Sequence, residues 1–312
     1  MVCSGVLRAL VLVLTMLCAP VWAQELRVHS AGQGGAFLPY AQGLARHLNA
    51  AGLGPVVALE STGSIANLAA AESDPASLGL VFLASAHEAI TGTGFAQGKK
   101  HENVRALFPM YETSVQIAAL RSSGIARFAD LNRKRLGVGP AGGPSEIYVR
   151  AFAAELRIAP ELVTGTADEL AEALLAGRID ALWQGASVPI PALASVAERA
   201  DAVVFGLTGT EIATIVRLFP FLAPARVPAN AYRGQTAVLN SVAAWNFVVA
   251  HKDLPDARVE AILRAVFGTA DPARDIHAFA GGTRAANAGT NRVVPFHPAA
   301  ARYYREAGVA LP

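Results

Sequence analysis

The stretch MYETSVQIAAL, residues 110–120, alternates apolar and polar side chains well enough to predict one long β-strand. A comparable apolar strand is expected at residues 242–250, after a complete series of α/β units has ended. Two long strands that bracket such a series indicate that the chain enters a second lobe once and returns once. We therefore place one lobe at residues 24–111 plus 238–312 and the other at residues 112–237. A single doubly wound domain is the alternative, and periodicity alone does not separate the two.

Short apolar runs alternate with helical patterns before and after this stretch, which is typical of a parallel sheet covered by helices. Further strands are predicted at residues 26–29, 56–59, 78–83, 136–139 and 179–183, and helices at residues 38–51, 65–71, 146–156 and 167–175. Thr166 and Glu169 have the spacing of a capping box, in which each side chain binds a free backbone N–H of the other residue. Gly52 and Gly177 are placed to end helices.

Residues 1–23 have the features of a secretory signal peptide. Arg8 precedes a short apolar run at residues 9–17, and Val21-Trp22-Ala23 offers a small-residue cleavage site. The run is too short to span a bilayer. Leu17 stands before Cys18, where a lipid-attachment box needs a small residue. We expect a freely soluble exported protein, located in the periplasm.

The composition excludes several classes of function. Cys3 and Cys18 both lie in the segment expected to be removed, so disulfides, cysteine-ligated metals and cysteine nucleophiles are excluded from the mature chain. Removing Arg8 lowers the formal net charge from +2 to +1, and the remaining basic residues are dispersed, which argues against nucleic acid or an anionic membrane as the partner. The seven histidines lack the spacing of a zinc site. We expect no metal, no cofactor and a monomer.

Four predicted strands run directly into a glycine- or serine-rich turn and then a helix, at residues 32–37, 61–64, 139–145 and 184–191. In α/β folds ligands bind at the carboxyl ends of strands, where the free N–H groups of helix N-termini favour an anion. Glycine lets the backbone approach such a ligand closely. A single turn of this kind is more often only a helix cap. Its repetition at strand ends in both predicted lobes favours a ligand site.

The candidate ligand contacts are the residues of these turns and of the helix starts that follow them. From the first lobe they are Gln33, Gly34, Gly35, Ala36, Phe37, Ser61, Thr62, Ser64 and Asn67. From the second lobe they are Gly142, Gly143, Ser145, Glu146, Gln184 and Ser187. Each has a structural alternative: Ser64 and Ser145 as N-caps, Asn67 as a polar surface residue, and Glu146 as a complement to a helix N-terminus rather than a partner for a ligand ammonium group.

In chain order, GQGGAFLP, STGSIANL, MYETSVQIAAL, residues 138–146, residues 180–191 and HPAAARYYREAGV resemble the TAXI subfamily of TRAP transporter solute receptors. The resemblance implies a type II periplasmic-binding-protein fold, with two α/β lobes joined by hinge strands and a ligand cleft between them. It also implies capture of a small organic anion or amino acid, such as a dicarboxylate, a 2-oxoacid or a glutamate-like molecule, and delivery to TRAP membrane permease subunits. An ABC-type receptor and an exported sensor for a membrane histidine kinase are the alternatives. An enzyme on this scaffold needs a reactive lysine or histidine in the cleft, and the candidate turns contain neither.

The sequence departs from the subfamily pattern in three of the turns. Phe37-Leu38 stands where the subfamily usually has a tyrosine pair, and Gly143-Pro144-Ser145-Glu146 has lost one hydroxyl. Gln184-Gly185-Ala186-Ser187 stands where a glycine pair is common. Fewer hydroxyls suit a ligand that is less densely polar than glutamate. His297, Tyr303 and Tyr304 are interpreted as packing and capping of the last helix.

Overall fold

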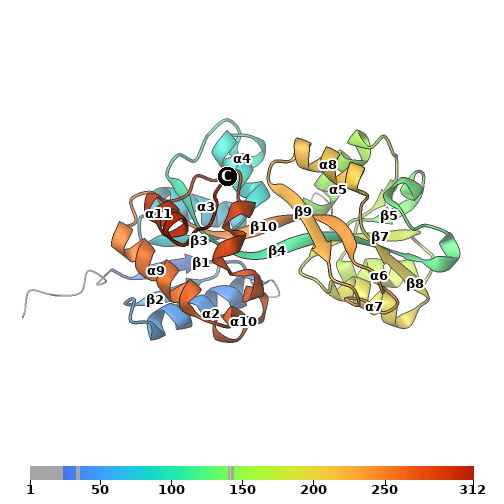
Figure 1. Cartoon of the computed structure of the whole chain (residues 1–312). Coiled ribbons are helices and arrows are strands. Elements are labelled where there is room, and N and C mark those ends of the chain that lie inside the picture. Colours follow the sequence, from blue (N-terminus) through green and yellow to red (C-terminus); the bar gives the residue numbers. More distant parts are fainter. Residues whose placement is uncertain (1–23, 33–35, 140, 142–143) are drawn as a thin grey trace, which may run out of the picture.

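The computed structural model describes residues 24–32, 36–139, 141 and 144–312, and in these residues the chain forms two α/β lobes (Figure 1). Five of the predicted site residues lie outside the described residues, namely Gln33, Gly34, Gly35, Gly142 and Gly143. No helix of the described chain is long and apolar enough to cross a membrane.

The first lobe contains three parallel strands and helices on both sides of them. Its first part comprises β1 (Leu26–His29), α2 (Phe37–Ala50), β2 (Val56–Leu59), α3 (Ser64–Ser73), β3 (Ser77–Phe82), α4 (Leu83–Thr91) and the 3-10 turn η1 (Gly94–Ala96). β1 lies between β2 and β3 and is parallel to both. The C-terminal part of the chain completes this lobe with α9 (Asp256–Gly268), α10 (Pro272–Asp275), η4 (Ala278–Gly282), η5 (Ala285–Thr290) and α11 (Pro298–Glu306).

The second lobe repeats the α/β pattern. Its elements are η2 (Arg121–Ser123), η3 (Phe128–Leu131), β5 (Arg135–Gly137), α5 (Pro144–Glu155), β6 (Glu161–Val163), α6 (Ala167–Leu175), β7 (Ala181–Ala186), α7 (Pro191–Arg199), β8 (Ala202–Phe205), α8 (Gly209–Leu218) and β9 (Leu222–Val227). β5 lies between β6 and β7 and is parallel to both.

Two long strands, β4 (Val104–Leu120) and β10 (Leu239–His251), run antiparallel to each other through both lobes and join them (Figure 1). They give one sheet of order β2-β1-β3-β10-β4-β7-β5-β6, with β8 on β4 and β9 on β10. The predicted strand at residues 110–120 is therefore part of a longer one. The parallel pairing expected of the α/β units is found within each lobe, whereas β4 and β10 are antiparallel to their neighbours. The predicted lobe limits fall within β4 and just before β10, and they remain predictions.

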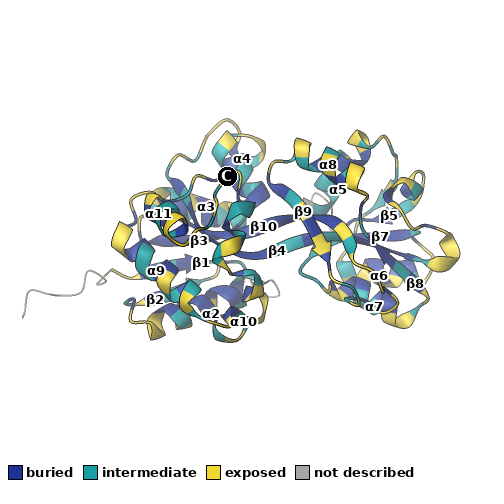
Figure 2. Cartoon of the chain, viewed as in Figure 1, coloured by how far each residue is buried: buried dark blue, intermediate teal, exposed yellow. Residues whose placement is uncertain are grey.

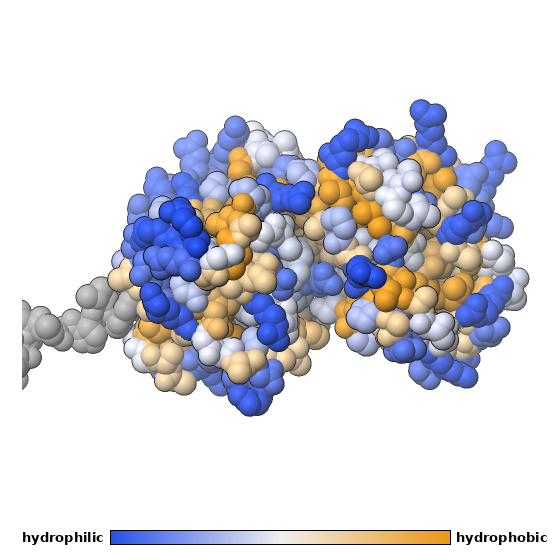
Figure 3. All heavy atoms as spheres, in the orientation of Figure 1, coloured by the Kyte–Doolittle hydropathy of each residue, from blue (hydrophilic) through white to orange (hydrophobic). Residues whose placement is uncertain are grey.

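The sheet has two faces, which we call face A and face B. Face A is covered by α3 and α4 in the first lobe and by α5 and α8 in the second, and one hydrophobic cluster there contains residues of both lobes. Face B is covered by α2, α9 and α11 in the first lobe and by α6 and α7 in the second, and each lobe has its own cluster there. Buried residues follow the strands and the inner sides of the helices (Figure 2). Charged and polar residues occupy much of the outer surface of both lobes, and the outline narrows between them (Figure 3).

Local sequence signals explain several element boundaries. Leu38, Ala41, Leu44 and Leu48 form the buried side of α2, as their spacing predicts. Gly52 follows that helix with φ of 75°, a left-handed conformation that glycine adopts without strain. The capping box at the start of α6 and the cap at the start of α11 are confirmed. The Thr166 hydroxyl accepts the N–H of Glu169, and the Glu169 carboxylate accepts the N–H of Thr166. At α11, the His297 ring accepts the N–H of Ala299 at 3.2 Å.

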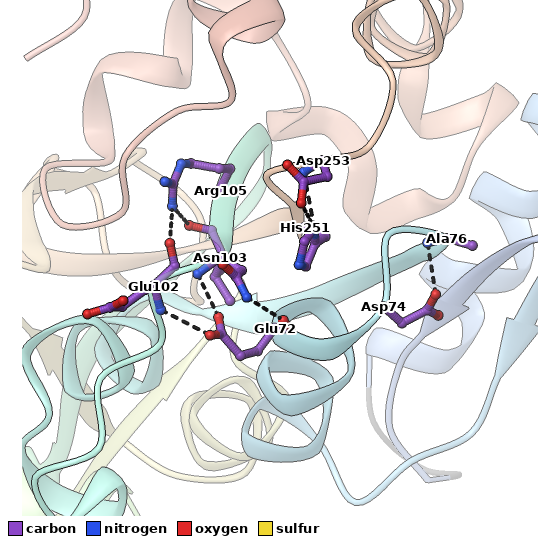
Figure 4. A network of polar contacts seen from close by, with 9 residues as sticks. Glu72, Asp74, Ala76, Glu102, Asn103, Arg105, His251 and Asp253 are labelled. Atoms are coloured by element: carbon purple, nitrogen blue, oxygen red, sulfur yellow. Dashed lines mark hydrogen bonds and ion pairs between the residues drawn. The ribbon is translucent and has the colours of Figure 1, made fainter.

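A network of hydrogen bonds connects the end of α3 to the start of β4 in the first lobe (Figure 4). The Glu72 carboxylate, at the end of α3, accepts the N–H groups of Glu102 and Asn103 at 3.1 and 2.8 Å. The Asn103 amide in turn donates to the Glu72 carbonyl at 3.0 Å, and Arg105 donates to the Glu102 carbonyl at 2.9 Å. These bonds hold the start of β4 against α3, at the end of the strand away from the second lobe.

Candidate functional site

The turn between β2 and α3 is held by internal hydrogen bonds. Asn67 is fully buried, and its amide donates to the carbonyls of Ser30 and Leu80, both at 2.6 Å. The Ser61 hydroxyl lies 2.7 Å from Asn67 Oδ1 and 2.9 Å from the Ser30 carbonyl. Asn67 is therefore not the polar surface residue of the alternative interpretation, and its role as a ligand contact stays a prediction. Its amide connects the residue that follows β1 to the middle of β3, and a buried amide of this kind is costly to leave without these bonds.

The first residue of α3 connects this turn to the end of β3. Gly63, with φ of 108°, takes the N-cap position of α3, so Ser64 is not the cap. The Ser64 hydroxyl instead accepts the N–H of Phe82 at 3.1 Å. Thr62 is exposed beside them. The turn is thereby positioned against Phe82, which faces the second lobe.

A cavity of about 80 Å³ lies on face A, at the boundary between the lobes. Its walls come from both lobes and from β4, one of the two strands that join them. Phe82 lies in the first lobe, Thr113 and Val115 lie in β4, and the second lobe contributes Ser145, Tyr148 and Trp183. The Ser145 hydroxyl is buried there and has no hydrogen-bond partner among the described residues. Ser145 is the second residue of α5, so its hydroxyl stands beside the positive end of that helix. The arrangement suits a polar group of a ligand whose remaining part is apolar.

Aromatic rings meet across the lobe boundary on the same face. The rings of Phe82 and Tyr148 have centroids 6.3 Å apart, and those of His87 and Phe221 are 5.7 Å apart. Burial raises the pKa of the Tyr148 phenol, and the Glu88 carboxylate of α4 adds to the rise, so this phenol stays neutral. Burial lowers the pKa of His87. The lobes are thus in apolar contact beside the cavity.

Two exposed isoleucines lie at the helix starts on this boundary. Ile65 in α3 is 51% exposed and Ile147 in α5 is 54% exposed, the highest values among the large exposed hydrophobic residues described. Each stands in the first turn of its helix, next to Ser64 in one lobe and near Ser145 in the other. Exposed aliphatic side chains at this position would be covered if the lobes moved together.

The other predicted residues lie elsewhere. Glu146 forms an ion pair at 2.6 Å with Arg150, which lies one turn later in α5. Gln184 of β7 lies opposite Gln116 of β4 in the sheet, on face B. Its buried side-chain amide nitrogen has no hydrogen bond among the described residues. Ala36 and Phe37 pack against the face-B cluster of the first lobe. The predicted set is therefore divided between the two faces.

A second interlobe cavity, of about 420 Å³, lies on face B. Ser187 lines it, together with Glu112, Trp245 and Arg226. Tyr111 is one of its wall residues, and the ring of Phe37 packs against the Tyr111 ring at a centroid distance of 6.4 Å.

Sequence reasoning missed Phe82, Thr113 and Tyr148 as wall residues on face A. Thr113 carried a usable signal, because it follows the alternation of the predicted strand at residues 110–120. Tyr148 also did, because it lies three residues after Ser145 and so shares its side of the helix. Phe82 carried none, since its position depends on how the lobes meet. No group of three potential metal ligands is found within the described residues.

Three solved structures share the fold, at low sequence identity. A TctC solute-binding protein from Polaromonas has a TM-score of 0.55 and 13% identity, covering 79% of this chain and 84% of its own. Rpa4515 of R. palustris, solved with adipate, has a TM-score of 0.52 and 14% identity, covering 92% and 95%. MatC (Rpa3494) from Rhodopseudomonas palustris, with bound malate, has a TM-score of 0.51 and 14% identity, covering 82% and 88%.

These likenesses establish the α/β periplasmic-binding-protein fold that the resemblance implied. By their descriptions the neighbours are one solute-binding protein, one protein solved with adipate and one with bound malate. None of the three is described as a TAXI receptor. A model of the NMT1-like family matches residues 28–308, and the chain therefore belongs to the NMT1-like family.

Proposed function

We propose that this protein is an exported solute receptor that captures a small organic acid between its lobes. The observation that carries the proposal is the face-A cavity, which takes its walls from both lobes and contains the buried hydroxyl of Ser145 at the start of α5, without a hydrogen-bond partner among the described residues. A helix N-terminus with an available donor favours a carboxylate. Walls of Phe82, Tyr148 and Trp183 favour an apolar body. Adipate and malate, bound by two proteins of the same fold, fit this description to different degrees.

Capture proceeds by closure of the lobes over the ligand. β4 and β10 are the strands that cross between the lobes, so bending at these strands changes the distance between α3 and α5. Closure would bury Ile65 and Ile147, and that gain of buried apolar surface would stabilise the closed form. Thr62, Ser64 and Ser145, with the predicted turns at residues 33–35 and 142–143, are the proposed ligand contacts.

The partner and location follow from the resemblance to TAXI receptors. We propose that a signal peptide at residues 1–23 directs the chain to the periplasm and that TRAP permease subunits receive the ligand from the monomeric receptor. An ABC permease or a membrane histidine kinase is the alternative partner. Genes for a TRAP permease beside this one support uptake, whereas an adjacent histidine kinase gene supports sensing.

The test is a thermal-shift screen of the purified protein with dicarboxylates, 2-oxoacids and amino acids, followed by calorimetry of the compounds that raise Tm. Adipate or a related acid should raise Tm, and Ser145→Ala should weaken its binding by about 10-fold or more, the scale of one hydrogen bond to a charged acceptor. Ile147→Ser should weaken binding without lowering stability, while Val238→Ser, at an exposed residue that does not line the face-A cavity, serves as its control. Tm shifts with neutral or cationic compounds only would contradict the proposal.

A further inference from the structure

The larger interlobe cavity is separated from the Ser145 cavity by the hinge strands. Glu112 and Trp245 form a cross-strand pair and both line the larger cavity. The adjacent pair, Thr113 and Ala244, lines the smaller one. Successive strand residues point to opposite faces of a sheet, so the two cavities lie on opposite sides of β4 and β10. A ligand in one is not in contact with a ligand in the other.

Both lobes contribute walls to this cavity of about 420 Å³, a volume within the range of small-molecule sites. Tyr111, Phe279 and Gly282 come from the first lobe, and Ser187 and Arg226 from the second. Gly282 brings η4 close to the hinge, because a Cβ at that position would lie 3.0 Å from the Met110 carbonyl oxygen and 3.2 Å from the Trp245 ring. Close packing of η4 against β4 and β10 therefore forms this part of the cavity wall.

The cavity is lined by two side chains of opposite charge. Glu112 is half-buried on the hinge strand, and burial raises its pKa. Arg226 of β9 is exposed at the cavity wall. Across the described part of the chain, neither side chain makes a hydrogen bond or an ion pair, and they do not pair with each other. Half-buried carboxylates are normally compensated, so Glu112 is available to a ligand.

Aromatic side chains surround the carboxylate. Tyr111 and Trp245 are almost fully buried in the wall, and Phe279 has its ring centroid 5.9 Å from that of Tyr111. Ring faces attract organic cations, most strongly where water is excluded. A carboxylate among such rings recognises an ammonium group, and the unpaired guanidinium recognises a carboxylate.

We propose that this cavity is a second ligand site and binds a small dipolar organic ion, a betaine or an amino acid. Its cationic nitrogen lies at Glu112 between the aromatic rings, and its carboxylate lies at Arg226. The ligand thereby contacts the hinge and both lobes at once. Its charge pattern differs from that of the organic acid at Ser145, because an acid without a cationic group leaves Glu112 unpaired.

Isothermal titration calorimetry of the purified protein with glycine betaine and L-proline tests the site. Tetramethylammonium and acetate serve as probes that carry only one of the two charges. Saturable binding of at least one dipolar probe, tighter than either single-charge probe, is expected. Glu112→Gln and Arg226→Gln should each weaken it by about 10-fold, since each removes one charge-assisted contact.

Two matched variants separate a local effect from a general change in charge. Glu306→Gln and Arg305→Gln alter exposed residues at the end of α11 and should bind the dipolar probe like the unmodified protein. Melting curves of Glu112→Gln and Arg226→Gln confirm that both variants fold. Absence of saturable binding by both dipolar probes would overturn the proposal, as would unchanged binding in Glu112→Gln or acetate binding as tightly as betaine.

Discussion

Face A and face B of the hinge strands join the lobes in different ways. On face A one hydrophobic cluster continues from α3 and α4 into α5 and α8, and the Phe82 and Tyr148 rings meet across the boundary. On face B the two lobes have separate clusters, and the cavity between them contains Glu112 and Arg226, neither of which forms an ion pair within the described residues. Apolar contact therefore stabilises one side of the lobe junction, while the other side is polar and open to a ligand.

The largest expected effect is loss of stability on truncating an aromatic residue of face A. Phe152 is 1% exposed, and its ring lies 5.5 Å from Trp183 and 5.3 Å from Phe219. Phe152→Ala should lower the free energy of unfolding by about 3–5 kcal/mol. Phe279→Ala on face B, where the ring is 40% exposed, should cost less than about 1 kcal/mol. Urea denaturation of both variants measures the difference, and equal losses would show that the faces do not differ in this way.

The part of the fold set by local periodicity was predictable. The alternation at residues 110–120 identified the hinge strand, and Thr166 with Glu169 identified the start of α6, because both signals are complete within a few residues. The antiparallel pairing of β4 with β10 was not predictable. It joins segments more than a hundred residues apart, and nothing in the alternation of either segment specifies its partner.

The candidate site was predictable only as a set of turns. Ser145 and Ser187 both follow strands of the second lobe, but the structure places them at cavities on opposite faces of the sheet. The sequence does not reveal this division, because it depends on which side of the sheet each following helix packs. Glu112 stands in the quoted stretch itself, yet its lack of a partner is a property of the folded surroundings.

A smaller effect is expected where face A uses a polar side chain internally. Asn67→Ala should lower the free energy of unfolding by about 1–3 kcal/mol, because the buried carbonyls of Ser30 and Leu80 lose the amide that they now bind. Asn132 is an exposed asparagine that accepts one backbone N–H, from Ala159 at 3.0 Å. Asn132→Ala should therefore cost less. A loss for Asn67→Ala no greater than for Asn132→Ala, measured by denaturation, would show that Asn67 is not the internal tie described.

The smallest effect concerns the unpaired carboxylate of face B. Burial raises the pKa of Glu112 in the folded chain above its unfolded value of about 4.3, so the folded state binds more protons between the two values. The contribution of Glu112 to stability therefore falls as the pH rises through that interval, and at pH 7 the charged carboxylate is destabilising. Glu112→Gln should raise the free energy of unfolding at pH 7 by a fraction of a kcal/mol, and the gain should disappear below about pH 4, where both side chains are neutral. Melting curves at the two pH values measure the gain, with Glu306→Gln as the exposed control. A Glu112→Gln variant that is less stable at pH 7 would mean that the carboxylate has a partner in the folded protein, and the contrast between the two faces would then not hold.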